Sequence, residues 1–416
     1  MRELRVRLRF SATDVRDVGT LAEDGRRVWF AYDEAFRAAG LAISPLRLPL
    51  TGPALVEHVT KPGVPIPGVF NDARPEGWGL KLLHRAFQAK GRAVSSVSPL
   101  DELAFLGHHT MGAIVFEPST GPTGALDDAV ALAALAAHAQ QVFDDTVQTV
   151  LPQLVLAGGP SGGARPKALI GLRDDGAPGV RYGEGELPEG WGAWLVKFPT
   201  SAEDADVGRR EAAWMAMARA AGVEVPATTV LPLEGVGDAF AVRRFDRAAG
   251  GARTHVLSAA GALNVDFRTT TADYEHLLRA THVVCNGDQS QVSALFRLAA
   301  FNVASVNEDD HLKNLAYLLG PDGVWRLAPA FDLTYSPRPY GERCTTVAGA
   351  GRAVGRDHLL VVAERVGIKP VVARRILDEV STATADVRAH LRDAGCDGPV
   401  SRAAAVAVEE ATGRVR

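Results

Sequence analysis

The chain reads Asn307-Glu308-Asp309-Asp310-His311-Leu312-Lys313-Asn314 between two apolar stretches, and Asp332 follows 18 residues after Asn314. Burying charge without a partner costs free energy, so a polar run of this kind is usually either exposed or functional. Four residues separate Asp309 from Asn314, and the strand-like segment 324–327 precedes Asp332. Because Asp and Asn are also favoured in capped turns, three unrelated turns are the plain alternative.

This spacing is typical of phosphoryl transfer. Protein kinases use an Asp-x-x-x-x-Asn loop, followed after a short hairpin by a second Asp. The chemistry needs an oxygen that accepts the hydroxyl proton, hard oxygen ligands for Mg²⁺ and cations that neutralise the phosphates. The pattern therefore favours an enzyme that transfers a phosphoryl group. Asp309 and His311 could instead bind a transition metal, although no cysteine or further histidine lies near them in the sequence.

The remaining parts of such a site can be found upstream, in the order that kinases use. Residues 158–167 form a glycine-rich loop whose backbone N–H groups could approach phosphate, although such a loop is often a plain surface connection. Lys197 ends a predicted strand, and Glu211 on the following helix could pair with it. Lys197 by itself could be a solvated edge residue, but the apolar residues on either side of it favour a functional role; Glu211 could equally be a carboxylate on the helix surface. The segment 241–245 lies where a hinge would contact an adenine.

Composition is that of an ordinary globular protein with a large core. Apolar residues make up 47% and charged residues 23%, and the net charge is −4. A balance this close to neutral argues against coating nucleic acid by charge alone. The three cysteines, at positions 285, 344 and 396, are too far apart for a disulfide framework. No apolar run is long enough to span a membrane, and the charged N-terminus is unlike a signal peptide, so we expect a cytoplasmic protein.

Hydrophobic periodicity predicts an α+β fold in three parts. We expect an N-terminal subdomain over 1–145, a central α+β part with the glycine-rich loop over 146–245, and a helical part with the catalytic loop over 246–416. The predicted strands cover 4–10, 27–32, 113–116, 168–172, 193–198, 228–233 and 239–245. The predicted helices cover 76–88, 127–156, 207–221, 273–285, 290–306, 356–367, 370–392 and 399–412.

Five motifs stand in kinase order along the chain. They are Gly162-Gly163-Ala164-Arg165-Pro166-Lys167, Trp194-Leu195-Val196-Lys197-Phe198-Pro199, Arg244-Phe245-Asp246-Arg247, Asp309-Asp310-His311-Leu312-Lys313-Asn314 and Ala328-Pro329-Ala330-Phe331-Asp332-Leu333. Together they resemble the motifs of the HipA-like toxin kinases, bacterial serine/threonine-protein kinases of type II toxin–antitoxin systems. The resemblance covers residues 25–385 and implies a two-lobed protein-kinase-like fold, with an N-terminal α/β subdomain and an all-helical C-terminal lobe.

The resemblance also implies a role for each matching residue. Asp309 would be the catalytic base, and Asn314 and Asp332 would hold Mg²⁺. Some family members phosphorylate themselves on a serine two residues before the first glycine; here Pro160 fills that position, so autophosphorylation would fall on Ser161. The ATP site would be lined by Gly162, Gly163, Ala164, Arg165, Pro166, Lys167, Lys197, Arg243, Arg244, Phe245, His311, Lys313, Asn314, Phe331 and Asp332.

The partners that the resemblance implies are a protein substrate with a Ser or Thr hydroxyl, such as an aminoacyl-tRNA synthetase, and a small helix-turn-helix antitoxin. DNA would be bound only indirectly, through the antitoxin, and no membrane is involved. Two other functions stay open, namely a small-molecule kinase of the same superfamily and a non-catalytic co-repressor module. The alternating Arg5, Arg7 and Arg9 are usually the solvated face of a strand, but they could contact DNA or an antitoxin.

Overall fold

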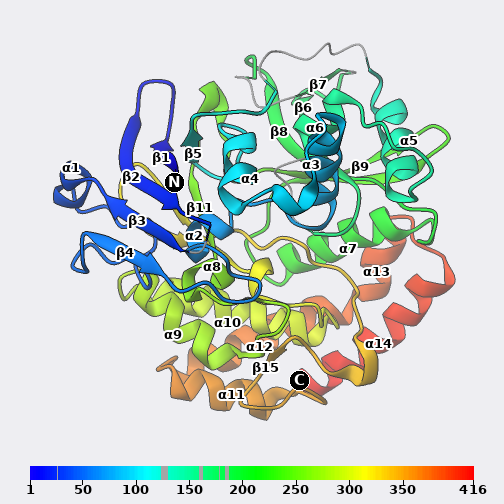
Figure 1. The fold of residues 1–416 in the computed structure, drawn as a ribbon. Helices are drawn as coiled ribbons and strands as arrows, with labels where there is room; N and C mark the ends of the chain where they lie inside the picture. Colours follow the sequence, from blue (N-terminus) through cyan, green and yellow to red (C-terminus); the bar gives the residue numbers. More distant parts are fainter. Residues whose placement is uncertain (26, 123–129, 159–162, 178, 183–186) are drawn as a thin grey trace.

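The N-terminal part of the chain is built on a five-stranded antiparallel sheet, on the left in Figure 1. The computed structural model describes residues 1–25, 27–122, 130–158, 163–177, 179–182 and 187–416. Three of the five strands were predicted, and the strands Val15–Glu23 and Leu55–His58 were not. The first of these two contains Gly19 and several charged residues, and the other is short and mostly exposed, so neither shows a clear strand pattern. In sheet order the strands are β4 (Leu55–His58), β3 (Val28–Tyr32), β2 (Val15–Glu23), β1 (Arg2–Arg9) and β5 (Ile114–Glu117).

The basic side chains of β1 are matched by acidic neighbours. Arg7 donates to Asp17 at 2.6 Å and to Glu117 at 2.7 Å, and Arg5 donates to Asp33 at 3.0 Å. Cross-strand ion pairs of this kind stabilise an exposed sheet face. The arrangement favours the solvated-face interpretation of Arg5 and Arg7 over a contact with nucleic acid.

Four α-helices lie between β3 and β5 in the chain. They are α1 (Glu34–Ala38), α2 (Gly68–Asn71), α3 (Gly77–Ala89) and α4 (Pro99–Leu106). In α4, the Ser98 side chain accepts from the Asp101 N–H, and the Asp101 side chain accepts from the Ser98 N–H; this reciprocal capping fixes the start of the helix. The helix α3 packs against α6 (Pro152–Gly158) beside the second sheet, so the N-terminal part contacts the central part directly (Figure 1).

A second five-stranded antiparallel sheet forms the central part, and α7 (Val207–Ala220) lies between it and the helices below (Figure 1). The helix buries Trp214 completely, and its indole N–H donates to the carbonyl of Ser305 at 3.0 Å. Of the predicted helix 127–156, only α5 (Leu132–Phe143) and α6 form within the described residues. In sheet order the strands are β7 (Val180–Tyr182), β6 (Lys167–Arg173), β8 (Trp191–Lys197), β10 (Gly237–Arg243) and β9 (Thr228–Leu233).

The C-terminal part is mostly helical. The central α10 (Gln289–Ala304) is buried along most of its length and is surrounded by the other helices. The predicted helix 370–392 is divided at Asp386. The other helices are α8 (Ala259–Leu263), α9 (Tyr274–Val284), α11 (Arg356–Arg365), α12 (Pro370–Ala385), α13 (Val387–Asp393) and α14 (Pro399–Val415).

The expectation of an all-helical C-terminal lobe is wrong. The strands β11 (His255–Ser258), β13 (Ala316–Leu319) and β14 (Trp325–Leu327) form a third sheet, and β12 (Ala272–Asp273) pairs with β15 (Thr345–Thr346). These strands are short, and β11 finds its partner about 60 residues away in the chain, so local periodicity gives little sign of the pairing. The strand β13 begins two residues after the loop 307–314, and Thr345 of β15 donates its N–H to Asp310 within the loop at 3.1 Å.

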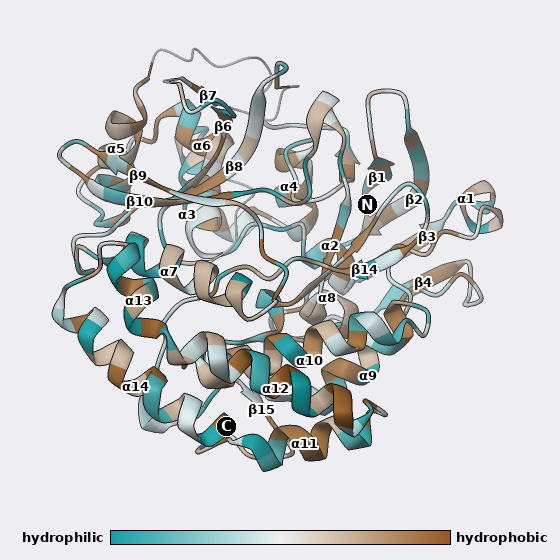
Figure 2. Ribbon diagram, turned by 180° about the vertical axis from the view of Figure 1, so that it is seen from behind, coloured by the Kyte–Doolittle hydropathy of each residue, from teal (hydrophilic) through white to brown (hydrophobic). Residues whose placement is uncertain are grey.

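Hydrophilic and hydrophobic residues alternate around the helices of the C-terminal part (Figure 2). This amphipathic pattern is typical of helices that cover a core on one side only. Within the residues that the structure describes, no helix combines the length and the apolar character needed to cross a membrane.

Candidate active site

Three charged side chains from distant parts of the chain meet at the end of β8. The ammonium of Lys197 lies 2.5 Å from Oδ1 of Asp332 and also forms an ion pair with Oε1 of Glu211. Lys197 is the last residue of β8, Glu211 lies on α7, and Asp332 follows β14. Burial alone would lower the pKa of Lys197, but the carboxylates of Asp332 and Glu211 outweigh it and the pKa is raised. Lys197 is therefore held in its charged form.

Asp332 has a strained backbone and an accessible carboxylate. Its φ of +57° lies in the left-handed region, which is uncommon for a residue other than glycine and recurs at functional sites. The side chain is 43% exposed. Lys197 holds the pKa of this carboxyl well below its usual range, so Asp332 is an anion at neutral pH.

The glycine-rich loop reaches this cluster through Gly163 and Lys167. Lys167 stands directly opposite Lys197 in the sheet, and burial together with the neighbouring Lys197 lowers its pKa to about 8. Gly163 has φ at +78°, a backbone conformation that favours glycine, and a Cβ there would lie 2.6 Å from the Lys167 ammonium, so the loop backbone passes close to this cation. Ser161 and Gly162, predicted for autophosphorylation and for ATP contact, lie outside the described residues.

The other loop residues take different positions. Arg165 donates to the Phe198 carbonyl at 3.2 Å, and its guanidinium lies 3.3 Å from Glu211, so it supports the carboxylate that pairs with Lys197. Ala164 is exposed, and Pro166 is buried.

The predicted catalytic base and its neighbouring asparagine are joined by a hydrogen bond. The Asn314 side-chain N–H donates to the backbone carbonyl of Asp309 at 3.0 Å, which closes the loop on itself. The Asp309 carboxylate is half exposed, with Arg338 at 3.3 Å and the thiol of Cys344 at 3.5 Å. Arg338 and Cys344 were not anticipated from the sequence, because they reach Asp309 from a later loop and carry no motif spacing.

Asp310 anchors the same loop from inside the core. Its buried carboxylate accepts from Arg343 at 2.8 Å, from the Tyr274 hydroxyl at 2.9 Å and from the Thr345 N–H at 3.1 Å. Three donors satisfy a buried carboxylate well, and they fix the backbone on which Asp309 stands. Adjacent aspartates thus differ sharply: one is exposed toward solvent and the other is a structural anchor.

Aromatic rings line the neighbouring region. The Phe267 and His311 rings lie 4.7 Å apart between centroids, and the Phe245 and Phe331 rings lie 5.6 Å apart. The second pair joins the end of the central part to the segment before Asp332, which is where the sequence predicts a hinge.

The predicted hinge arginines point elsewhere. Arg243 is largely exposed and lies 3.1 Å from Asp174. Arg244 is buried and pairs with Asp246 at 2.8 Å; Asp246 also accepts from the Gly112 N–H at 2.7 Å. Arg244 therefore stabilises the junction with the N-terminal part, and its guanidinium is already committed there.

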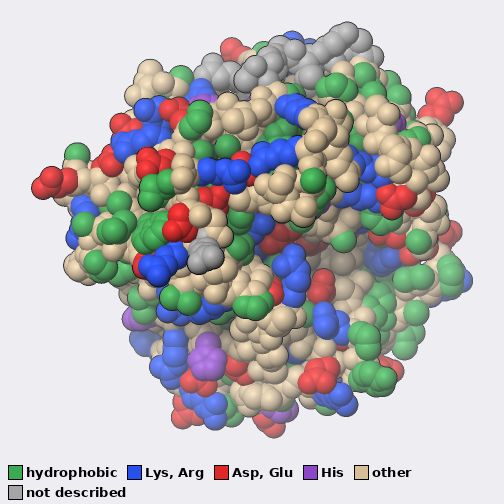
Figure 3. Space-filling model, viewed as in Figure 1, with side chains coloured by type: hydrophobic (Ala, Val, Ile, Leu, Met, Phe, Trp, Pro, Cys, Tyr) green, Lys and Arg blue, Asp and Glu red, His purple; other side chains and the backbone are tan. Residues whose placement is uncertain are grey.

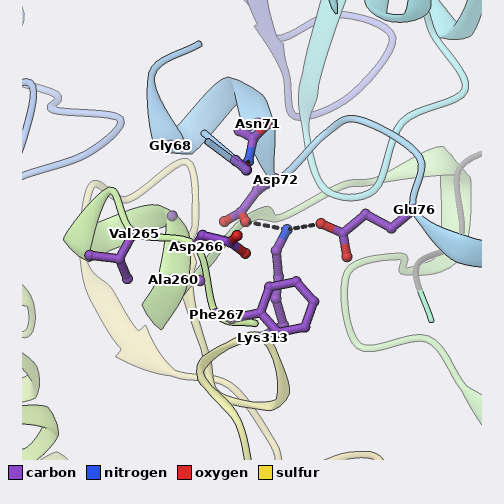
Figure 4. Close-up of a pocket in the computed structure, with 11 residues that line it drawn as sticks. Gly68, Asn71, Asp72, Glu76, Ala260, Val265, Asp266, Phe267 and Lys313 are labelled. Carbon is purple, nitrogen blue, oxygen red and sulfur yellow. Dashed lines mark hydrogen bonds and ion pairs between the residues drawn. The ribbon is translucent and has the colours of Figure 1, made fainter. Parts of the chain in front are cut away.

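Lys313 lies away from the Lys197 cluster, between two carboxylates of the N-terminal part. Figure 4 shows its ammonium pointing between Asp72 and Glu76, at 2.7 Å and 3.4 Å. Neither acidic residue was predicted as part of the site. The predicted residues thus form one cluster around Lys197 and a second around Asp309, with Lys313 at the boundary of the N-terminal part.

A strand lysine paired with a helix glutamate, an Asp-x-x-x-x-Asn loop and a following aspartate, in this order, are typical of a kinase. Two family models match the chain: the HipA-like C-terminal domain over residues 160–387 and the HipA N-terminal domain over residues 12–117. The first spans more than half of the sequence. The chain therefore belongs to the HipA family, and it is a HipA-like kinase, which implies ATP as the phosphoryl donor.

Two relatives extend the comparison. The chain is 27% identical over 355 residues to a protein of Sinorhizobium fredii (strain NBRC 101917 / NGR234) named "Putative kinase Y4dM", covering 79% of this chain and 76% of that protein. It also superposes on a chain of the Shewanella oneidensis MR-1 toxin–antitoxin complex of HipA, HipB and operator DNA. That match has a TM-score of 0.68 and 17% identity and covers 99% of this chain and 96% of the other. At this identity the likeness speaks for the fold, a mixed α+β fold with N-terminal sheets and a helical C-terminal part.

Proposed function

We propose that this HipA-like kinase transfers the γ-phosphoryl group of ATP, with Mg²⁺, to a Ser or Thr hydroxyl of a protein, as the toxin of a toxin–antitoxin system. The observation that carries the proposal is the Lys197–Glu211–Asp332 cluster beside the Asp309–Asn314 loop. In this view the chain has the two lobes of a protein kinase. The central sheet and α7 form one lobe and the C-terminal helices the other, with an N-terminal appendage; the bounds 1–145, 146–245 and 246–416 stay a prediction.

Asp309 suits the role of base. Its carboxylate is half exposed, so a substrate hydroxyl can approach it, and its backbone is fixed by Asn314 on one side and by the buried Asp310 on the other. In this role Asp309 accepts the hydroxyl proton as the oxygen attacks the γ-phosphorus. Arg338, at 3.3 Å, must then give way to the incoming hydroxyl.

The residues present also fit Mg²⁺. The hydrogen bond from the Asn314 side-chain N–H to Asp309 commits the nitrogen of that amide, so the amide oxygen is the atom that can bind a metal. The carboxylate of Asp332 is anionic and partly exposed, and the Lys197 ammonium lies against its Oδ1. Mg²⁺ prefers oxygen ligands and keeps several waters, so one carboxylate and one amide are enough. When bound, the ion would neutralise charge that develops on the phosphates.

Lys167, Lys197 and the backbone at Gly163 suit the phosphate chain. The two buried lysines stand opposite each other on neighbouring strands, so their positive charges repel. The nearby carboxylates of Glu211 and Asp332 offset this repulsion. A triphosphate would add further negative charge next to these lysines. Autophosphorylation on Ser161 remains part of the proposal and rests on the sequence alone.

The partners are proposed from the family. The Shewanella structure contains HipB and operator DNA, and by analogy we assign to this chain a small helix-turn-helix antitoxin that carries the DNA contact. Basic and acidic side chains are interspersed over the face shown in Figure 3, which fits indirect rather than direct DNA binding. The target would be a translation-related protein such as an aminoacyl-tRNA synthetase.

Labelled ATP distinguishes this proposal from its rivals. The purified protein is incubated with cell lysate, and the label is followed into macromolecules and metabolites separately. Phosphoserine or phosphothreonine in a protein band supports the proposal. Label in metabolites alone indicates a small-molecule kinase. No transfer above that of Asp309→Asn, with binding to a DNA-associated partner retained, indicates a non-catalytic co-repressor.

A further inference from the structure

The catalytic loop is tied to the N-terminal part through a partly buried charged triad of Lys313, Asp72 and Glu76. The lysine side chain is 17% exposed, and the two carboxylates are 10% and 16% exposed. The Lys313 ammonium lies 2.7 Å from Asp72 and 3.4 Å from Glu76, so two carboxylates match its positive charge. Removing one member of such a group leaves a charge without its partner, which is costly.

Asp72 is the fixed end of this triad. Besides the Lys313 ammonium, its carboxylate accepts from the backbone N–H and from the hydroxyl of Ser258, both at 2.7 Å. The same hydroxyl accepts from the Gly261 N–H and caps α8. The N–H of Ala259 in turn donates to the Leu315 carbonyl at 2.7 Å, directly after the catalytic loop. Asp72 therefore holds Lys313 against a rigid part of the fold.

Glu76 is held by fewer contacts than Asp72. It stands at the N-cap of α3, yet its side chain makes no cap hydrogen bond and instead lies 3.4 Å from Lys313, with Arg268 at 3.8 Å. Two residues later, the Trp78 N–H donates to the carbonyl of Gly163 at 2.9 Å. The segment 72–78 therefore contacts the catalytic loop and the glycine-rich loop at the same time.

Lys313 is the residue directly before Asn314. A lysine clamped between two carboxylates restricts the short 3₁₀ turn Leu312–Asn314, and with it the direction of the Asn314 amide. We propose that Asp72 and Glu76 are positioning residues, which hold the catalytic loop through Lys313 so that the Asn314 oxygen is placed for Mg²⁺. This inference rests on the proposed function, because it assigns Asn314 to the metal.

The test compares Glu76→Gln with Glu102→Gln in the full chain. Glu102 is a matched control because its carboxylate likewise pairs with a cation, Arg74 of the same segment at 2.6 Å, but inside the N-terminal part. Two quantities are measured: amide hydrogen exchange over residues 307–315 without nucleotide, and the affinity for a non-hydrolysable ATP analogue with Mg²⁺ and with EDTA. If Glu76→Gln fails to fold, Glu76→Asp and the double variant Glu76→Gln/Lys313→Met replace it.

Glu76→Gln is expected to speed exchange over 307–315 and to weaken binding of the Mg²⁺ complex by about five- to tenfold, a typical size for coupling between charged neighbours. Binding in EDTA should change far less, and Glu102→Gln should alter neither quantity. Glu76→Asp should retain the wild-type behaviour, and Glu76→Gln should add nothing in a Lys313→Met background. The inference would be overturned if Glu76→Gln exchanged its amides and bound the analogue like the wild type. It would also be overturned if Glu76→Gln and Glu102→Gln had equal effects on both quantities.

The two proposals fail separately. A wild-type protein that binds the analogue but phosphorylates no protein contradicts the proposed function, while the exchange measurement still tests the positioning role. An active wild type whose Glu76→Gln variant is unchanged in exchange and in Mg²⁺-dependent affinity contradicts only the positioning role.

Discussion

The ammonium of Lys197 lies 2.5 Å from the carboxylate of Asp332, although the two residues are 135 positions apart in the chain. This contact joins the central sheet to the segment that follows the catalytic loop, and Glu211 adds a third charge from α7. Buried charges are retained only when each has a partner, so the three side chains depend on one another.

Replacing Lys197 with methionine leaves Glu211 and Asp332 without their shared cation and removes a phosphate ligand. We expect kcat/KM for phosphoryl transfer to fall by at least about 100-fold, as when an electrostatic contact to the transition state is lost. Steady-state kinetics measure this. Lys81→Met is the control, because Lys81 pairs with the exposed Asp145 at 3.0 Å, away from the cluster. Equal kinetics for Lys197→Met and wild type would refute the assignment.

Binding of ATP should depend on pH through Lys167. Its pKa of about 8 means that it is mostly protonated at pH 7 and mostly neutral at pH 9, whereas the raised pKa of Lys197 keeps that residue charged throughout. Affinity for the analogue should therefore fall as the pH rises, by up to about tenfold at pH 9 if the charged form binds. Calorimetry between pH 7 and pH 9 tests this. The Lys167→Met variant should bind weakly and without this dependence; an identical pH profile in the variant would count against the role.

Asp310→Asn should act on stability. The substitution leaves the buried Arg343 without its anionic partner, and we expect the free energy of unfolding to fall by about 3 kcal/mol, as for other broken buried ion pairs. Urea denaturation measures the loss. Asp309→Asn is the natural comparison, since its carboxylate is half exposed and should cost less than about 1 kcal/mol. Similar losses in both variants would contradict the distinction between anchor and base.

Gly77 is the first residue of α3, lies against Gly163 of the glycine-rich loop and has φ at +46°. In Gly77→Ala the new methyl group would press against the carbonyl of Gly163, so we expect a loss of about 1–2 kcal/mol and weaker ATP binding. Gly91→Ala is the control, because Gly91 has φ at +73° but nothing within 4 Å of an added Cβ. It should lose stability through the backbone alone and bind ATP normally. Thermal unfolding measures the stability of both variants, and calorimetry measures their ATP binding. Normal ATP binding by Gly77→Ala would show that the contact between Gly77 and Gly163 does not support the glycine-rich loop.

The sequence predicted the parts of the site that local motifs carry. Asp309, Asn314 and Asp332 stand at a spacing that phosphoryl transfer favours, and Lys197 and Glu211 follow the order of the same chemistry. The structure brings Lys197, Glu211 and Asp332 together and joins Asn314 to Asp309. A motif of this kind can be recognised in the sequence because strand, loop and hairpin geometry fix the distances between its residues.

Contacts between distant segments could not be predicted in the same way. Asp72 and Glu76 reach Lys313 only because the N-terminal part docks beside α8, and nothing in their local pattern indicates that docking. The short strands of the C-terminal part are similar, since β11 and β13 pair only after the chain has passed through the three helices α8, α9 and α10. Arg338 shows the same limit, because its loop has no periodicity that would place it beside Asp309.

The most direct test of the account is the rate of phosphate transfer from labelled ATP to protein Ser or Thr, measured side by side for wild type and Asp309→Asn. Both proteins should show the same unfolding curve and bind the ATP analogue alike. We predict that the wild type labels a protein and that Asp309→Asn does so about 100- to 10,000-fold more slowly, the contribution of a positioned base. Equal labelling by the two proteins, or label that never enters a protein, would contradict the account.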